Sequence, residues 1–570
     1  EYGSILKVKP GDYAKLREQL NSFAPMDRLF YASRTEQLIH QTEILSRKYT
    51  IAVTNPPYMP ASKFDSKLKT YVGMYYADSK SDLYSVFMEV CLSMAQAMGY
   101  VSMINMQSWM FLSGQEKLRN LIQSMGSMVN MIHLGPGAFP EMVGDVLQTT
   151  TFTIRVGATD ITGDYIRVTD VRDSNKKEAL SLAAIADEKH ELRYRASNAD
   201  FEVFPGKIIA YWASNAMKRA FINGKSLDPN YAHTNTGIMT GDNGRFVRLW
   251  WEVPEPKLKT DAENADAAQV SGKKWFPYNK GGEFRRWYGN NDYIVNWQDD
   301  GREIFSRREG EKRFSQNIPR QYRFTPALTW SKISSGNISF RYKPSGHLFD
   351  IAGASMFADN ETLTYLQGML NSSIIGKFAS VMSPTLNFES GQIGSYPIIE
   401  SVEYRDEVID VVNENRLISK SEWDSFETSW DFERHPLLPV SNESKLADAF
   451  ETWDNLSETR WNKLKTNEER LNEIFIEVYG MQDELNPTVE DKYVSVRKAD
   501  MTREAKSLLS YFVGVMFGRY SLDKPGLNFA GGEWNAANQS TLVDADNIVP
   551  IMDGEFYTDD IVKKLRDFLV

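Results

Sequence analysis

Cysteine is nearly absent from this chain of 570 residues, which contains only Cys91. A single thiol excludes an intramolecular disulfide framework and the zinc sites that are built from several cysteines. Long apolar runs are also missing, because stretches such as LLSYFVGVMF at 508–517 are far shorter than the roughly 20 residues that span a bilayer. The first residues show no secretory signal pattern. We therefore expect a cytoplasmic protein that does not bind a membrane.

Signals for metal binding and nuclease activity are missing as well. The histidines, among them His133, His233, His347 and His435, are isolated and show no ligand spacing. We therefore expect no metal site. The Pro-Asp and Glu-x-Lys arrangement of a metal-dependent nuclease is not found either, so we expect no nuclease activity in this chain.

The residues that are present are typical of a large soluble globular protein, with 42% hydrophobic, 12% aromatic and 25% charged residues. The length predicts three or four structural units. The net charge is −11, yet residues 271–345 carry 15 Lys or Arg against 7 acidic residues, a local net charge of +8. A concentrated positive segment in an acidic protein indicates a surface for an anionic partner.

Helices and strands alternate in the first 195 residues. The helix expected at 81–99 would be capped by Ser81 or Asp82 and stopped by Gly99, and a buried strand at 49–53 would precede it. The other expected elements are helices within 12–48 and 113–126 and strands at 100–106, 128–135 and 147–156. This alternation predicts an α/β fold with a Rossmann-like, mostly parallel sheet covered by helices on both faces.

The composition and the expected secondary structure change twice after residue 195. From about residue 196 the segments are aromatic, punctuated by glycine and rich in strand-forming residues, whereas from about residue 401 long helical stretches return. We therefore expect three domains, at 1–195, 196–400 and 401–570. The second would be α+β and the third helical.

The segment Asn55-Pro56-Pro57-Tyr58 directly follows the strand expected at 49–53. Functional residues gather at the carboxyl ends of strands in an open parallel sheet. An ordinary strand-ending turn would also use Asn and Pro. However, each residue of the tetrad can be given a role in a single reaction, the alkylation of an exocyclic amine.

The N6 amine of adenine is a poor nucleophile because its lone pair is delocalised into the ring. The Asn55 side-chain oxygen and the Pro56 carbonyl could accept its two hydrogens and so favour a more tetrahedral nitrogen. Pro56 and Pro57 stiffen the turn because proline locks φ and has no N–H. Tyr58 can stack on a base that has left the helix, and such stacking is worth about 1–3 kcal/mol.

The tetrad and the residues after it carry a family resemblance. NPPY followed by DLYSVFMEVCLSMAQAMGYVSMINMQSWMF resembles the adenine-N6 DNA methyltransferases that share the Asn-Pro-Pro-Tyr motif. The resemblance implies that Asn55 and the motif Asp82-Leu83-Tyr84 lie beside the methyl donor, S-adenosylmethionine. It also implies that Phe139, in the loop GAFPEMVGDV, closes on the second face of the flipped base. A core aromatic residue is the alternative for Phe139.

Strings further along the chain narrow the resemblance. TGDNGRFVRLWWEV, KGGEFRRWYGNNDYIVNW and SWDFERHPLL resemble the PglX-like methyltransferases of BREX phage-defence systems, in order and over nearly the whole chain. Family members carry a glycine-rich donor loop and a ribose-binding acidic residue well before the tetrad, and these are missing before Asn55. We therefore expect an internal portion of a longer methyltransferase that lacks the main donor-binding motifs.

The resemblance places a DNA target-recognition domain at 196–400, where the basic segment lies. Arg and Lys would neutralise phosphates, and a few polar side chains would read base edges. Any single one of these arginines could instead be an ordinary solvated surface residue. The candidate DNA-binding residues are Asn243 and Arg245 in the glycine-flanked loop GDNGR, then Arg285, Arg286 and Trp287, and finally Lys377 and Asn387.

The leading hypothesis is a site-specific DNA adenine-N6 methyltransferase that flips its target base and marks host DNA. Its partners would be double-stranded DNA, other BREX defence proteins and phage-encoded DNA mimics. Two alternatives remain open. The chain could belong to a fused restriction-modification enzyme whose nuclease precedes residue 1, or it could act as a non-catalytic DNA-recognition and scaffold module.

Overall fold

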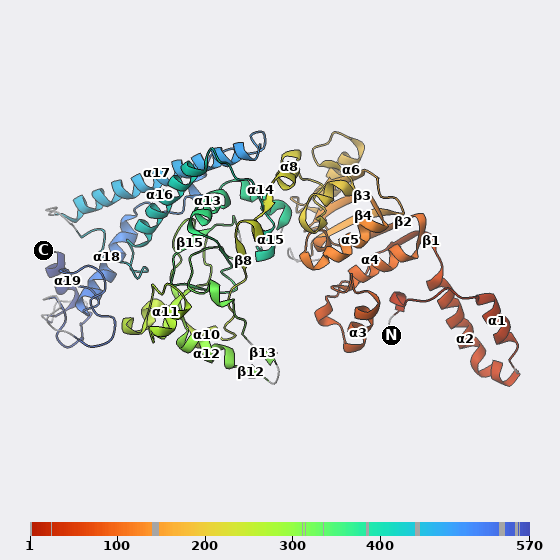
Figure 1. Ribbon diagram of the computed structural model, residues 1–570, viewed down its shortest axis with the longest axis horizontal. Helices are drawn as coiled ribbons and strands as arrows, with labels where there is room; N and C mark the ends of the chain where they lie inside the picture. The colour runs from red at the N-terminus through yellow and green to blue at the C-terminus, as the bar shows by residue number, and fades with distance from the viewer. Residues whose placement is uncertain are drawn as a thin grey trace. The chain divides into compact units, whose positions relative to one another are not determined.

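The chain folds into two compact units, Glu1–Ile222 and Asn223–Val570 (Figure 1). The structure is a computed structural model, and each unit is described by itself. The residues that it describes are 3–23, 25–139, 147–309, 312–313, 315–334, 336–383, 387–438, 445–534, 542–552, 557 and 559–569. The division into three domains stays a prediction.

The first unit is built on a six-stranded sheet with the strand order β1-β2-β4-β3-β5-β6. Its strands are β1 Tyr49–Thr54, β2 Ala95–Met106, β3 Gly126–Gly135, β4 Thr149–Val156, β5 Gly163–Arg167 and β6 Arg193–Ala196. The pairs β1–β2 and β3–β5 are parallel, whereas β4 is antiparallel to both of its neighbours and β6 is antiparallel to β5. Four of the six strands therefore run in one direction, which agrees with the α/β fold expected from the sequence.

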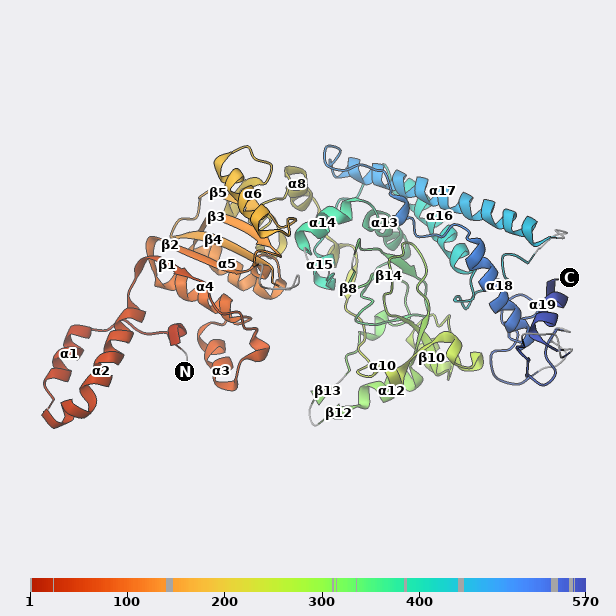
Figure 2. The same ribbon diagram turned by 180° about the vertical axis from the view of Figure 1, so that it is seen from behind.

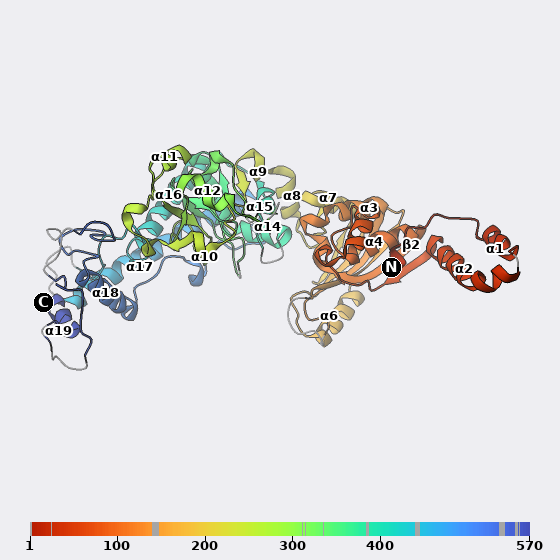
Figure 3. The ribbon, with the colours of Figure 1, turned by 90° about the horizontal axis from the view of Figure 1, so that it is seen from below.

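Helices cover both faces of this sheet. Figure 3 shows α4 (Leu83–Met94) and α6 (Ser174–Ala186) on opposite sides of it. Helix α6 packs on a cluster that contains Ile132 of β3 and Ile166 of β5. The remaining helices of the unit are α1 Tyr13–Asn21, α2 Pro25–Ser46, α3 Ser66–Tyr75, α5 Glu116–Met125, α7 Asn198–Glu202 and α8 Asn215–Asn223, which crosses the boundary between the units.

Two details of the expected secondary structure are wrong. Strand β1 is not buried, because it is the last strand at one end of the sheet and the side chains of Ile51 and Val53 are 60% and 73% exposed. Helix α4 ends at Met94, so Gly99 does not stop it and lies inside β2 instead. A Cβ atom at Gly99 would come within 2.8 Å of the Thr50 carbonyl oxygen, so glycine allows β1 and β2 to approach closely.

The second unit begins with small sheets and short helices and ends in longer helices. Its two larger sheets have the orders β16-β10-β11-β9 and β15-β14-β17-β8. Their strands are β8 His233–Asn235, β9 Val247–Leu249, β10 Trp275–Asn279, β11 Tyr293–Asn296, β14 Ala327–Thr329, β15 Arg341–Lys343, β16 Leu348–Phe349 and β17 Ser355–Phe357. Two-stranded pairs are formed by β7 Lys225–Ser226 with β18 Pro397–Ile398 and by β12 Arg308–Glu309 with β13 Lys312–Arg313. Residues 225–398 are thus mixed α and β, as expected.

The longest helices described in the second unit are α16, α17 and α18, which all lie after residue 404. Helices α16 and α17 lie side by side in both Figure 1 and Figure 2. The bounds are α9 Leu227–Asn230, α10 Asn243–Phe246, α11 Ala265–Val270, α12 Gln298–Ser306, α13 Asn360–Leu370, α14 Ile374–Met382, α15 Ser390–Gly394, α16 Arg405–Trp423, α17 Leu446–Val478, α18 Met501–Met516 and α19 Ile561–Leu569. This agrees with the helical third region predicted from the sequence.

Among the described residues, no helix is both long enough and apolar enough to cross a bilayer.

Candidate active site

The candidate site lies at one edge of the six-stranded sheet. Strands β1, β2 and β3 run in the same direction, so their carboxyl ends meet at this edge. Asn55 follows β1, Gln107 follows β2 and Phe139 lies four residues after β3. The topology therefore brings three segments that are distant in sequence to a common edge, where open α/β sheets carry their ligand sites.

The tetrad leaves β1 with its polar and aromatic groups exposed. Asn55, Pro57 and Tyr58 are exposed, whereas Pro56 is buried and anchors the turn. The Tyr58 hydroxyl lies 3.3 Å from Asn55 Oδ1 and 3.4 Å from the carbonyl oxygen of Ile104 in β2. The side chains of Asn55 and Tyr58 therefore lie next to each other, and both are open to solvent.

Asp82 holds the end of this turn. It is the N-cap of α4, and its Oδ1 accepts hydrogen bonds from the backbone N–H groups of Met59 at 3.0 Å and Tyr84 at 3.2 Å. The Leu83 N–H donates in turn to the Met59 carbonyl at 2.9 Å. Burial raises the pKa of the Asp82 carboxyl, and these N–H groups oppose the shift. Asp82 therefore stabilises the backbone of the tetrad loop, residues 55–60, through its hydrogen bond with the Met59 N–H.

Tyr84 lies beneath Tyr58 and is 2% exposed. The two rings meet edge to face, with centroids 6.1 Å apart and planes at 89°. The Tyr84 hydroxyl lies 2.9 Å from Ser108 Oγ and accepts a hydrogen bond from Gln115 Nε2 at 3.3 Å. Of the motif Asp82-Leu83-Tyr84, only Asp82 and Leu83 are half-buried, so they are the members that a ligand could reach.

A second polar network, which the sequence analysis missed, lies at the end of β2. His133 Nε2 lies 2.7 Å from Gln107 Oε1, and His133 Nδ1 lies 2.9 Å from the Tyr211 hydroxyl. Gln107 Nε2 donates to Gln148 Oε1 at 2.6 Å. Burial lowers the pKa of His133 to about 3. The spacing of these residues carries no sequence signal, because the sheet alone brings them together.

Phe139 is 38% exposed at the end of the segment that follows β3. The preceding turn requires glycine at position 137, where φ is +76° and a Cβ atom would come within 2.4 Å of the Arg172 carbonyl oxygen. The rest of the loop, 140–146, lies outside the described residues. An exposed ring at this edge is compatible with a ligand contact and does not support a core role.

A groove next to the tetrad loop also escaped the sequence analysis. It has a volume of about 890 Å³ and lies between α3, the loop to Ser81 and the start of α5. Lys69, Lys80 and Lys117 line it together with Asp78 and Glu116, and Lys117 Nζ lies 3.9 Å from Asp78 Oδ1. These lysines are scattered along the sequence, so no local run of charge marks the groove.

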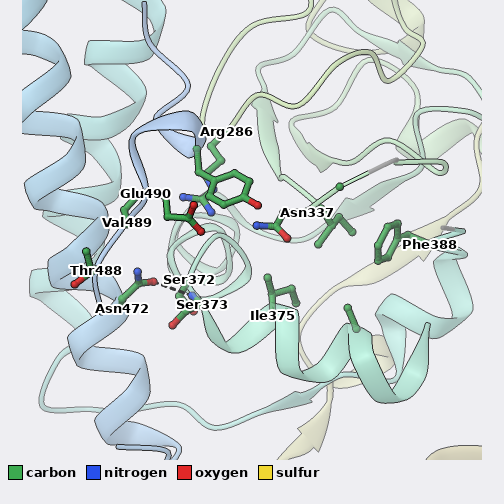
Figure 4. Close-up of a pocket in the computed structure, with 15 residues that line it drawn as sticks. Arg286, Asn337, Ser372, Ser373, Ile375, Phe388, Asn472, Thr488, Val489 and Glu490 are labelled. Carbon is green, nitrogen blue, oxygen red and sulfur yellow. Dashed lines mark hydrogen bonds between the residues drawn. The ribbon is translucent and has the colours of Figure 1, made fainter. Parts of the chain in front are cut away.

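The strongest DNA-binding candidates of the second unit are buried. Arg285 and Arg286 are 7% and 9% exposed and Trp287 is fully buried. Arg285 pairs with Glu422, and Arg286 pairs with Glu468 at 2.6 Å. Arg286 lines a small pocket of about 280 Å³ (Figure 4), but its guanidinium is engaged inside the protein. Contact of these three residues with DNA stays a prediction, and the binding of their polar groups to α16 and α17 does not support it.

Six of the basic residues within 271–345 pair with acidic residues from elsewhere in the second unit. Besides Glu422 and Glu468, the partners include Asp242 for Arg307, Asp350 for Lys280 and Glu389 for Lys332. Arg341 and Lys343 are completely buried and donate to oxygen atoms of the protein. A charge count along the sequence therefore overstates the positive charge at the surface.

The other four DNA-binding candidates lie nearer the surface. Asn243 and Arg245 are exposed in α10, a short helix capped by Asp242 where a flexible loop was expected. Arg245 pairs with Glu303. Lys377 is half-buried, with its Nζ 3.4 Å from Glu484 Oε2, and Asn387 is exposed. No group of three or more metal-ligating side chains occurs within the part of the chain that the structure describes.

The chain supplies only part of a methyl-donor site. Asn55, Asp82 and Leu83 could face a donor, but no glycine-rich loop precedes Asn55 to hold its methionine end. The described residues therefore do not by themselves fit the whole of S-adenosylmethionine.

Comparison with known proteins identifies relatives of the chain. Residues 7–139 match the family model described as Eco57I restriction-modification methylase. The chain is 39% identical to the adenine-specific methyltransferase PglX of Lacticaseibacillus casei (strain Zhang), over 96% of this chain and 46% of the relative. It is 30% identical to the adenine-specific methyltransferase BrxX of Escherichia coli O9:H4 (strain HS), over 100% of this chain and 48% of the relative. The chain thus spans about half the length of these relatives.

The similarity to solved structures is weaker. The Type IIL restriction-modification enzyme MmeI in complex with DNA matches 81% of this chain and 57% of its own at 11% identity, with a TM-score of 0.45. The Type ISP restriction-modification enzyme LlaBIII bound to DNA matches 68% of this chain and 30% of its own at 12% identity, with a TM-score of 0.41.

Proposed function

This chain is PglX-like in sequence over 96% of its length, and on that premise we propose that the protein is a site-specific DNA adenine-N6 methyltransferase. The observation that carries the proposal is the shared position of Asn55 and Tyr58. A side-chain amide oxygen and an aromatic ring meet at the carboxyl end of β1, both open to solvent and 3.3 Å apart at their polar atoms. This is the pair that activation and stacking of a flipped adenine require.

In the proposed reaction, Asn55 and Pro56 bind the N6 amine of the target adenine. Asn55 Oδ1 and the Pro56 carbonyl accept the two N6 hydrogens, which localises the nitrogen lone pair and orients it for attack. The buried ring of Pro56 keeps the carbonyl in place. S-adenosylmethionine, when bound, supplies an electrophilic methyl group. Alignment of the two reacting groups would then lower the barrier. The donor would leave as a thioether when its S–CH3 bond breaks, and the proton lost from N6 would pass to water, to which the Asn55 side chain is open.

Tyr58 and Phe139 would hold the extruded base between their rings. Both side chains are exposed and both follow strands that end at the same edge of the sheet. Stacking on aromatic rings at about 1–3 kcal/mol per base offsets part of the few kcal/mol that extrusion costs. The exposure of the two rings supports a binding role for them.

Unit 2 would recognise the target sequence. Asn243, Arg245, Lys377 and Asn387 remain its candidate DNA contacts because they lie nearer the surface than the buried residues 285–287. In the cell, the protein would mark host DNA within a BREX-type defence system, together with the other proteins of that system and within reach of phage-encoded DNA mimics. The support for this setting is the sequence similarity to PglX and BrxX.

The proposal is tested by replacing Asn55 in the full-length protein. Asn55→Ala should lower the rate of adenine methylation by at least about 100-fold, as the loss of one preorganised hydrogen-bonding group does elsewhere. Its DNA affinity should stay within about twofold of wild type. Long-read mapping of modified adenines in cells gives the readout, and Asn455→Ala, at an exposed position of α17, is the matched control. Persistence of methylation in Asn55→Ala would refute the role of Asn55.

A further inference from the structure

The orientation of the Tyr58 ring depends on a residue below it. Tyr58 is exposed on one side, and on the other side its ring meets the edge of Tyr84 at a centroid distance of 6.1 Å. Edge-to-face contact between aromatic rings has a preferred geometry, which contributes about 0.5–1.5 kcal/mol beyond burial. A shift of Tyr84 would therefore be passed on to Tyr58.

Tyr84 is itself held by its hydroxyl group. This hydroxyl lies 2.9 Å from Ser108 Oγ, which follows β2, and 3.3 Å from Gln115 Nε2, which immediately precedes α5. Gln115 also exchanges hydrogen bonds with Ser85 Oγ at 3.0 and 3.2 Å. Gln115 and Ser85 are 4% and 0% exposed. The network thus joins the start of α4 to the end of β2 beneath the tetrad loop.

The geometry of Tyr58 matters for Asn55 as well. The Tyr58 hydroxyl lies 3.3 Å from Asn55 Oδ1, the oxygen assigned to the amine of the base. Any tilt of the Tyr58 ring would change both the stacking platform and the group beside that oxygen. Displacements of about 1 Å far from the reacting atoms are known to cost about 100-fold in rate.

We propose that Tyr84, held through its hydroxyl by Ser108 and Gln115, is a positioning residue that sets the orientation of Tyr58 against the flipped base. This inference rests on the proposed function. It assigns no contact with the base to Tyr84, which lies buried below the ring that makes the contact. Ser108 and Gln115 act on Tyr58 through their hydrogen bonds with the Tyr84 hydroxyl.

The test is Tyr84→Phe in the full-length protein, because this change keeps the ring and removes only the hydroxyl. The turnover number for methylation should fall about five- to tenfold while the KM for DNA stays within about twofold, because a misplaced ring affects alignment more than binding. With 2-aminopurine at the target position, the fluorescence of the bound DNA should rise because the flipped base is stacked less firmly.

Tyr76→Phe is the matched control. Tyr76 is also 2% exposed in the first unit, and its hydroxyl donates to the Ile5 carbonyl at 2.5 Å, whereas the Tyr84 hydroxyl binds Ser108 and Gln115. If Tyr84→Phe and Tyr76→Phe lower turnover equally and leave the fluorescence unchanged, the role of Tyr84 is only structural and the inference is overturned.

Ser108 provides an independent pair of variants in case Tyr84→Phe does not fold. Ser108→Ala should reproduce the loss of turnover and Ser108→Thr, which keeps a hydroxyl, should restore it. Equal turnover of the two variants would overturn the inference. Wild-type protein that binds DNA but never methylates adenine would instead refute the proposed function, and the inference would fall with it.

Discussion

His133 is an imidazole enclosed by neutral polar partners. Gln107 Oε1 can only accept, so His133 Nε2 carries the proton and Nδ1 accepts from the Tyr211 hydroxyl. Burial, together with the nearby charges of Arg167 and Lys177, lowers the pKa of the ring to about 3. The folded protein therefore keeps His133 neutral at pH values where an unfolded chain would protonate it.

This difference makes the stability of the first unit depend on pH. Between the unfolded pKa, about 6.5, and the folded value, the unfolded state binds the extra proton, so the stabilisation is complete above that range and is lost as the pH falls. The loss attributable to His133 should be about 2 kcal/mol at pH 5. Hydrogen exchange of peptides from β3 and β4 measures it. His133→Gln should flatten the dependence, whereas His40→Gln, at an exposed position of α2, should leave it unchanged.

At the scale of residues, the sequence predicts best where chemistry is local. The turn at Asn55 and Tyr58 could be predicted because a strand, a turn and an aromatic residue follow one another directly in the sequence, while the role of the two residues stays a prediction. The burial of Arg285 and Arg286 could not be predicted, because their partners Glu422 and Glu468 lie more than 100 residues away in the sequence. Only the packing of the helices brings those carboxylates to the arginines.

At the scale of elements, the groove between α3 and α5 places lysines next to the tetrad loop. Lys69 comes from α3, Lys80 from the loop before α4 and Lys117 from α5. A cluster of this kind neutralises phosphates without reading sequence. We therefore expect it to contact the DNA backbone beside the extruded base.

The salt dependence of DNA binding tests this contact. The double variant Lys69→Gln with Lys80→Gln should reduce the slope of log K against log salt concentration by about 2, because each lost phosphate contact removes close to one unit. The control pairs Lys176→Gln with Lys189→Gln, at exposed positions elsewhere in the unit. Equal slopes for the two double variants would show that the groove does not touch DNA. Fluorescence anisotropy over a range of salt concentrations provides the slopes.

The existence of most elements in the first unit could be predicted, but not their pairing. The apolar strand at 147–156 was expected and found as β4, yet nothing in its residues indicates that it inserts between β2 and β3 in the opposite direction. The end of α4 was also misplaced, because Gly99 serves a close approach to β1 and not a helix stop. Both features depend on neighbours that are distant in the sequence.

At the scale of the whole molecule, buried ion pairs join the strand-rich part of the second unit to its helices. Glu468 of α17 accepts from Arg286 at 2.6 Å and from the Trp287 indole at 2.7 Å. Burial raises the pKa of this carboxyl, and the charge of Arg286 opposes the shift. Breaking a buried ion pair of this kind is costly, because removing one partner leaves the charge of the other buried and unpaired.

Loss of the Glu468 charge should therefore destabilise the second unit. Glu468→Gln should lower the free energy of unfolding by about 3–5 kcal/mol, whereas removing the exposed partner in Arg245→Gln should cost less than about 1 kcal/mol. Urea unfolding followed by tryptophan fluorescence compares the two. The double change Arg286→Met with Glu468→Gln should recover most of the loss, because the glutamine oxygen can still accept from the Trp287 indole. If Arg286→Met weakened DNA binding while stability stayed intact, the residue would have to be reassigned to the DNA surface.

The outermost strand of the first unit has a practical consequence for handling the protein. Ile51 and Val53 project from β1 into solvent, and β1 has a paired neighbour on one side only among the described residues. An unpaired strand edge of this kind can form backbone hydrogen bonds with strands of other molecules and so lead to aggregation. We therefore expect the 570-residue chain to aggregate during purification unless the unpaired edge of β1 is covered.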